Sequence, residues 1–244
     1  MVFEEWTTNG GGRIAVARLN SPRNLNSLSM DMICLLKPQL QRWADDDSVC
    51  AVWLEAEGDK AFCAGGDIAE LYDTGTKGDF AYGRKCWADE YRMNAKLFEF
   101  PKPVVSFMQG FTMGGGVGVG CHGSHRVVGT TSQIAMPECG IGLVPDVGGS
   151  LILARAPGRL GEYLGLTGAR MGPADVLHAG FADYFIDEAQ WHELIATLEE
   201  NGDPFILDKA ATQPAPDPPA EAQAEIDHLF AGESLGKHLT LIHL

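Results

Sequence analysis

The sequence predicts an α/β fold, and three observations support that prediction. Strand-like and helix-like segments recur in a β-then-α order along most of the 244 residues. Two glycine-rich turns, AFCAGGD (61–67) and FTMGGG (111–116), each lead from an apolar strand-like run toward a helix-like run. A hydrophobic content of 45% and a charged content of 21% are typical of a globular chain with a sizeable core.

In the first half of the chain, apolar alternation predicts strands and helical spacing predicts helices. Ser29 is a suitable N-cap for the first helix, and Pro38 inside that helix should kink or divide it. Pro101 and Pro103 should end the last helix of this half. The expected elements are a strand at 13–19, a polar turn at 19–28, helices at 30–46, from 67 and at 80–98, and strands at 49–56 and 103–107.

In the second half, small apolar residues after the glycine triplet 114–116 suit a tightly packed helix. Pro173 should start a later helix, Gly180 should end it, and Asp187 should cap the next one. The other expected elements are helices at 150–156, 159–166 and 188–200, and a short strand at 182–186.

Composition changes near residue 200, so we expect a core of residues 1–200 and an appended segment, 201–244. Residues 212–225 are rich in proline, alanine and acidic residues, which is typical of a linker or exposed loop. The last residues, GKHLTLIHL, show no clear element. A truncated gene, a frame shift or a short variant would each produce such an end.

Charge and cysteine usage narrow the class of protein. A net charge of −15 argues against binding to nucleic acid or to an anionic membrane, and no apolar run reaches membrane-spanning length. The six cysteines form no CxxC or zinc-type spacing, and the N-terminus lacks a signal peptide, so we expect a cytoplasmic protein without a metal site. The expected partner is a small molecule, and a homo-oligomer is compatible with the sequence.

Residues 109–149 contain a glycine triplet and two carboxylates of the kind found in catalytic sites. The glycine triplet permits close backbone approach, and N–H groups at the start of a helix can bind developing negative charge. Two carboxylates, Glu138 and Asp146, each follow a proline. Alone, such features also serve packing, turns and helix caps. The second glycine-rich turn favours the chemical interpretation, because two turns can aim one N–H each at a single oxygen.

Five segments together resemble the enoyl-CoA hydratase/isomerase (crotonase) superfamily, in the order of that superfamily. They are LNSPRNLNSL (19–28), DKAFCAGGDI (59–68), PVVSFMQGFTMGGGVG (103–118), MPECGIGLVPDVGGS (136–150) and GEYLGLTGARMGPADVLHAGFADYFI (161–186). The resemblance implies a spiral of ββα units with flanking helices. It also implies an acyl-CoA thioester substrate, whose carbonyl oxygen is held in an oxyanion hole by the N–H groups of Ala64 and Gly115.

Within the superfamily, the segments are most similar to the 3-hydroxyisobutyryl-CoA hydrolases of valine breakdown. Hydratases use two glutamates, and the position of the first is Gly118 here, whereas Glu138 matches the second. Asp146 stands where hydratases carry a small residue. Both departures favour hydrolysis, with Glu138 as nucleophile or base and Asp146 orienting the substrate hydroxyl or a water. No cofactor is implied beyond the coenzyme A of the substrate.

Further residues are expected to bind substrate. Glu90 would position it or tune Glu138, and Arg23 and Lys60 are candidates for the CoA phosphates. The full expected substrate-binding set is Gly65, Gly66, Asp67, Glu90, Arg23 and Lys60. Two other functions stay open: an enoyl-CoA hydratase or isomerase that uses Glu138 alone, and an inactive acyl-CoA binding protein.

Overall fold

The computed structural model describes residues 1–215 and 222–232, and the final expected segment, GKHLTLIHL, lies outside them. Its strands form a six-stranded and a three-stranded sheet. The larger sheet has the order β1 (Val2–Thr7), β2 (Arg13–Leu19), β3 (Val49–Ala56), β5 (Val104–Met108), β7 (His125–Val128) and β9 (Tyr184–Phe185). The smaller sheet has the order β4 (Ala61–Cys63), β6 (Phe111–Met113) and β8 (Gln133–Ala135).

Consecutive strands are divided between the two sheets. The pairs β3–β4, β5–β6 and β7–β8 each place one strand in the larger sheet and the next in the smaller sheet. Every pairing is parallel except that of β1 with β2. Each strand pair leads into helical structure, so the expected α/β spiral of ββα units is confirmed.

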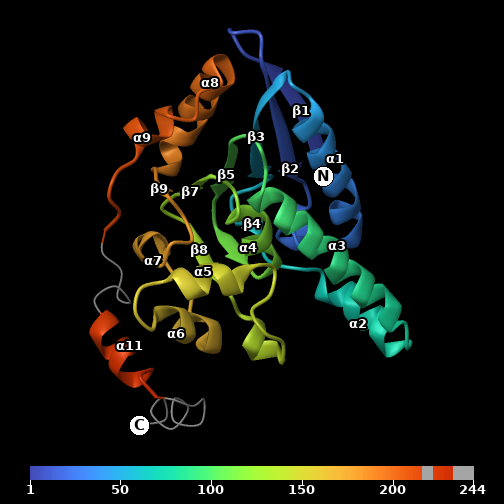
Figure 1. Cartoon of the computed structure of the whole chain (residues 1–244), viewed down its shortest axis with the longest axis vertical. Coiled ribbons are helices and arrows are strands. Elements are labelled where there is room, and N and C mark those ends of the chain that lie inside the picture. Colours follow the sequence, from blue (N-terminus) through green and yellow to red (C-terminus); the bar gives the residue numbers. More distant parts are fainter. Residues whose placement is uncertain (216–221, 233–244) are drawn as a thin grey trace.

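The helices surround the sheets (Figure 1). The α-helices are α1 (Met30–Asp45), α2 (Ile68–Thr76), α3 (Phe80–Phe98), α4 (Gly115–Gly120), α5 (Gly149–Arg155), α6 (Leu160–Thr167), α7 (Pro173–His178), α8 (Trp191–Asn201), α9 (Ile206–Ala210) and α11 (Gln223–Leu229). Within the described residues, the 3₁₀ helices are η1 (Pro22–Asn24), η2 (Glu138–Ile141) and η3 (Glu188–Gln190).

The larger sheet separates two hydrophobic clusters, because alternate residues of a strand face opposite sides. Ala15 and Ala17 of β2 belong to the larger cluster, which includes residues of α1 and α3. Ile14 and Val16 belong to the smaller cluster, with residues of α8 and α9. Figure 1 shows α8 and α9 on the side of the strands away from α1, α2 and α3.

Most expected elements are confirmed, and two details are wrong. The Ser29 hydroxyl accepts a hydrogen bond from the Met32 N–H, as expected of an N-cap. The expected division of α1 at Pro38 is wrong, because the helix continues to Asp45, while a kink there stays a prediction. The linker expected at 212–225 is too long, because α11 begins at Gln223. The expected domain boundary at residue 200 stays a prediction.

Asn26 joins the polar turn to the segment between β3 and β4. Its side-chain oxygen accepts from the Ser21 N–H at 2.8 Å, and its amide nitrogen donates to the carbonyls of Glu57 and Ala61, each at 2.9 Å. The residue is 1% exposed and has a φ of 53°, which asparagine tolerates better than most residues. This side chain therefore fixes the turn beside β4.

We predict that Asn26→Ala lowers the free energy of unfolding by about 2–4 kcal/mol, because buried partners lose their hydrogen bonds. Denaturant unfolding measures this loss. The control is Asn24→Ala, which removes an exposed amide from the same turn and should change stability by less than about 0.5 kcal/mol. Equal effects of the two substitutions would contradict the anchoring role.

Candidate active site

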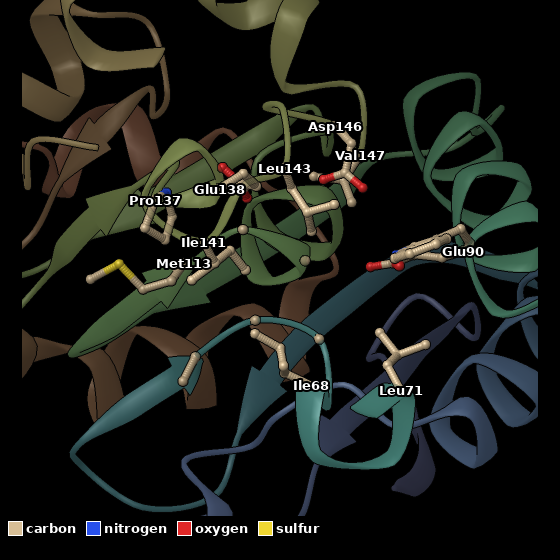
Figure 2. A pocket seen from close by; sticks show the side chains of 16 residues that line it. Ile68, Leu71, Glu90, Met113, Pro137, Glu138, Ile141, Leu143, Asp146 and Val147 are labelled. Atoms are coloured by element: carbon tan, nitrogen blue, oxygen red, sulfur yellow. The ribbon is translucent and has the colours of Figure 1, made fainter. Parts of the chain in front are cut away.

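A pocket forms where the two glycine-rich turns meet (Figure 2). Ile68 and Leu71 of α2 lie across it from Glu138 and Leu143, and Glu90 enters from α3. The pocket brings together seven residues expected from the sequence: Ala64, Gly65, Gly66, Glu90, Gly115, Glu138 and Asp146. The rest of its wall is mainly apolar.

Ala64 was expected to present its N–H to the pocket, and this prediction is wrong. The Ala64 N–H donates to the Leu25 carbonyl at 3.0 Å, so it is already used. Leu28 pairs with the residues on either side of Gly66, accepting from the Asp67 N–H and donating to the Gly65 carbonyl. These two hydrogen bonds pass on either side of Gly66, and its N–H has no acceptor among the described residues.

The Gly115 N–H is a second donor without an acceptor in the described part of the chain, because it opens α4. The two turns approach closely: a Cβ placed on Gly115 would lie 3.1 Å from the Gly66 nitrogen. Among the described residues, Gly66 and Gly115 thus form a neighbouring pair of free donors, in place of Ala64 and Gly115. The sequence signal for Gly66 was its position directly before the helix cap.

Glycine is required at the triplet because carboxylates lie against it. A Cβ on Gly114, whose φ is 48°, would lie 2.6 Å from Glu138 Oε1. A Cβ on Gly115 would lie 2.8 Å from Glu90 Oε1. Both distances are shorter than real carbon–oxygen contacts, so any side chain here would displace a carboxylate.

Glu90 and Glu138 are buried acids whose pKa values both rise to about 7. Burial is the main cause for each, and the charge of Asp146 adds to it. Glu90 Oε1 and Glu138 Oε2 are buried without a hydrogen-bond partner among the described residues. Two acids that exchange protons near neutrality, each with an unpaired oxygen, are suited to bind or activate a ligand.

Asp146 is half-buried in the loop between η2 and α5. Its Oδ2 accepts a hydrogen bond of 2.6 Å from the Tyr91 hydroxyl. Sequence reasoning missed Tyr91, although the residue directly follows Glu90 on α3. Asp146 and Glu90 both project into the pocket (Figure 2).

The space beside Gly118 is filled. A Cβ there would lie 2.6 Å from the Asn94 side-chain amide and 2.7 Å from Val147 Cβ. With its amide nitrogen toward α4, Asn94 donates to the carbonyls of Gly118 and Glu90 at 3.2 Å. The position that carries the first glutamate of a hydratase therefore has no room for a side chain.

Three expected substrate-binding residues lie apart from the pocket lining. Asp67 caps α2 by accepting from the Glu70 N–H. Arg23 and Lys60 line a separate depression beside the polar turn, together with acidic Glu57 and Asp59. Contact of Arg23 or Lys60 with CoA phosphates stays a prediction.

Residues 1–215 and 222–232 contain neither a candidate metal centre nor a candidate membrane span. No group of three His, Cys, Asp or Glu side chains there is placed to hold a metal ion. Within the same ranges, no helix combines the length and apolar character needed to cross a membrane.

The raised pKa of Glu90 should make the stability of the native chain depend on pH, and replacing Glu90 should remove that dependence. Between its unfolded pKa of about 4.3 and the folded value of about 7, Glu90 binds a proton only in the folded chain. Stability therefore falls as pH rises through this window. The unfolding free energy of Glu90→Gln minus that of the native chain should grow by about 2–3 kcal/mol from pH 4.5 to 8.

Denaturant melts at both pH values measure this difference. The control is Glu193→Gln, which replaces an exposed carboxylate on α8 and should leave the pH dependence unchanged. A constant difference between Glu90→Gln and the native chain would contradict the raised pKa of Glu90.

Comparison with known proteins agrees with this architecture. The family model described as enoyl-CoA hydratase/isomerase matches residues 14–243. A solved enoyl-CoA hydratase from Rhodobacter sphaeroides 2.4.1 is 51% identical, with a TM-score of 0.90, covering 99% of this chain and 69% of that one. A carnitinyl-CoA dehydratase from Mycobacterium thermoresistibile is 40% identical, with a TM-score of 0.92 and coverages of 99% and 70%.

Curated relatives carry a different name. The mitochondrial 3-hydroxyisobutyryl-CoA hydrolase of Xenopus tropicalis is 44% identical over 190 residues, which are 78% of this chain and 48% of the relative. Its Homo sapiens counterpart is 40% identical over 198 residues, 81% of this chain and 50% of the relative. The chain spans about half the length of these relatives. From the matched family model and these identities, the chain belongs to the enoyl-CoA hydratase/isomerase family.

Proposed function

We propose that this pocket hydrolyses acyl-CoA thioesters, with 3-hydroxyisobutyryl-CoA, an intermediate of valine breakdown, as the best candidate substrate. One observation carries the proposal: Glu138 and Asp146 line one pocket, while the space beside Gly118 has no room for the first glutamate of a hydratase. The names of the curated relatives support the same reaction.

The thioester carbonyl would lie against the start of α4. Its oxygen accepts hydrogen bonds from the N–H groups of Gly66 and Gly115, which stabilise the negative charge that develops on attack. The mainly apolar wall of the pocket strengthens this interaction, because electrostatic attraction is stronger beside apolar groups than in bulk water.

Glu138 has two possible roles in breaking the thioester. As a nucleophile, its carboxylate forms a bond to the carbonyl carbon, the carbon–sulfur bond breaks, and the CoA thiolate takes up a proton; water then hydrolyses the mixed anhydride. As a base, Glu138 takes a proton from water, whose oxygen attacks the same carbon; the carbon–sulfur bond then breaks, and the proton passes from Glu138 to the CoA thiolate. A pKa of about 7 leaves a large ionised fraction near neutral pH for either role.

Asp146 and Glu90 complete the proposed site. Asp146 accepts a hydrogen bond from the 3-hydroxyl of the substrate, because one of its oxygens faces no donor in the described residues. Glu90 lies beside Gly115, next to the position proposed for the carbonyl group. While Glu90 is protonated, it does not act as a second nucleophile. Its proton can instead be donated to a ligand oxygen.

The names of the solved neighbours favour a second candidate, an enoyl-CoA hydratase that uses Glu138. An acyl-CoA binding protein without turnover is the third. A homo-oligomeric state and a cytoplasmic location stay predictions; the curated relatives quoted above are named as mitochondrial.

Thiol release from a panel of acyl-CoA thioesters, run beside crotonyl-CoA hydration, tests the proposal. The native chain should release CoA from 3-hydroxyisobutyryl-CoA, and Glu138→Gln should lose at least about 1,000-fold in kcat while binding of the thioester is retained. Glu99→Gln, an exposed change at the end of α3, is the control. Hydration without thiol release would favour the hydratase, and undiminished kcat in Glu138→Gln would remove its role.

A pair of glycine substitutions tests the carbonyl position. A Cβ on Gly66 meets nothing within 4 Å, so Gly66→Ala should keep its N–H in place and change kcat/KM by less than about threefold. Gly115→Ala puts a methyl group against Glu90 and the Gly66 nitrogen, and should lower kcat/KM by about 100-fold or more. Thermal melts establish that both variants fold. Equal activities would mean that the triplet serves packing alone.

A further inference from the structure

The carboxylate of Asp146 is held from one side by a residue of a different element. Tyr91 lies on α3, and its hydroxyl donates to Asp146 Oδ2 at 2.6 Å. No other donor to this carboxylate occurs among the described residues. Oδ2 is therefore committed to Tyr91, and Oδ1 is left for a ligand in the pocket.

The backbone beneath Asp146 is held independently. Val147 has a φ of 47°, an unfavourable conformation for a β-branched residue, and is 2% exposed. His122 Nε2 lies 2.7 Å from the Val147 carbonyl oxygen. Because a carbonyl only accepts, this nitrogen carries the hydrogen. The Gly149 N–H also donates to the Asp146 carbonyl at 2.6 Å, which closes the turn.

His122 packs tightly as well as donating. It is 8% exposed, and a Cβ on Gly148 would lie 2.6 Å from its Nε2. The ring also makes an edge contact with Phe98 of α3. With the Cα position of Asp146 fixed in this way, rotation of its side chain is the remaining freedom, and the Tyr91 hydroxyl restricts that rotation.

We propose that Tyr91 is a positioning residue that sets the preference of this pocket for acyl groups with a 3-hydroxyl, by holding Asp146 so that Oδ1 faces the hydroxyl. The choice of substrate rests on the proposed function. Tyr91 stays a donor throughout the physiological range, because its partial burial and its hydrogen bond to Asp146 raise its pKa.

A purely structural role for Tyr91 would act differently. Tyr91 is 42% exposed and belongs to neither buried cluster, so its hydroxyl contributes little to the core. Loss of a structural contact would weaken binding of hydroxylated and unhydroxylated acyl groups alike. Loss of a positioning contact would weaken binding only of the ligand whose hydroxyl donates to Asp146.

The test measures binding of two non-hydrolysable CoA amides, the 3-hydroxyisobutyryl and isobutyryl analogues, by calorimetry. Four chains are compared: native, Tyr91→Phe, Asp146→Ala and the double variant. The control is Tyr82→Phe, the same change on the same helix at a residue that does not line the pocket. Thermal melts of each variant establish folding.

The native chain should bind the hydroxylated amide at least about tenfold more tightly. Tyr91→Phe should reduce this preference by about fivefold or more, through the hydroxylated amide alone, and should cause no further loss in the Asp146→Ala background. Tyr82→Phe should keep the native preference. The proposal is overturned by a native chain without preference, by equal weakening of both amides, or by additive losses in the double variant.

Turnover separates this proposal from the proposed function. If the native chain binds the amides with the expected preference but hydrolyses no thioester, the hydrolase proposal fails and the role of Tyr91 in binding stands. If thioesters are hydrolysed but Tyr91→Phe keeps the native preference, the role of Tyr91 fails and the hydrolase proposal stands.

Discussion

The close approach of two backbones is the constraint on which the rest of the structure depends. A Cβ on Gly116 would lie 2.2 Å from the Cys63 carbonyl oxygen, and one on Gly110 would lie 2.1 Å from the Lys60 carbonyl oxygen. Glycine at these positions lets α4 and β6 lie directly against β4. The free N–H groups of Gly66 and Gly115 come together for the same reason, so packing of the smaller sheet and assembly of the pocket depend on the same missing side chains.

This close packing also explains why the pocket can hold two acids in a chain with a net charge of −15. Glu90 and Glu138 are pressed against the triplet, away from water, and burial keeps part of each population protonated near neutral pH. An unpaired buried oxygen on each acid and the left-handed backbone of Val147 destabilise the folded chain. Such features persist where function requires them, and the large core offsets them.

Local sequence patterns predicted the helices and strands well. They could not predict contacts between residues that are distant in the sequence. Ser29 and the ends of α3 could be assigned because caps and helical spacing act within a few residues. Ala64 was assigned wrongly because the direction of an N–H depends on pairing with Leu25, which is distant in sequence.

Gly118 is surrounded by groups that come from separate parts of the chain. Asn94 of α3 fills the space beside it, and Val147 of the loop before α5 closes the remainder. A side chain introduced at 118 would collide with both, while removal of the Asn94 side chain alone would take a hydrogen-bond donor away from the Gly118 carbonyl. Room for a side chain at position 118 would therefore require coordinated changes on two separate segments of the chain, α3 and the loop before α5. The local packing thus makes the residue at position 118 depend on the side chains at 94 and 147.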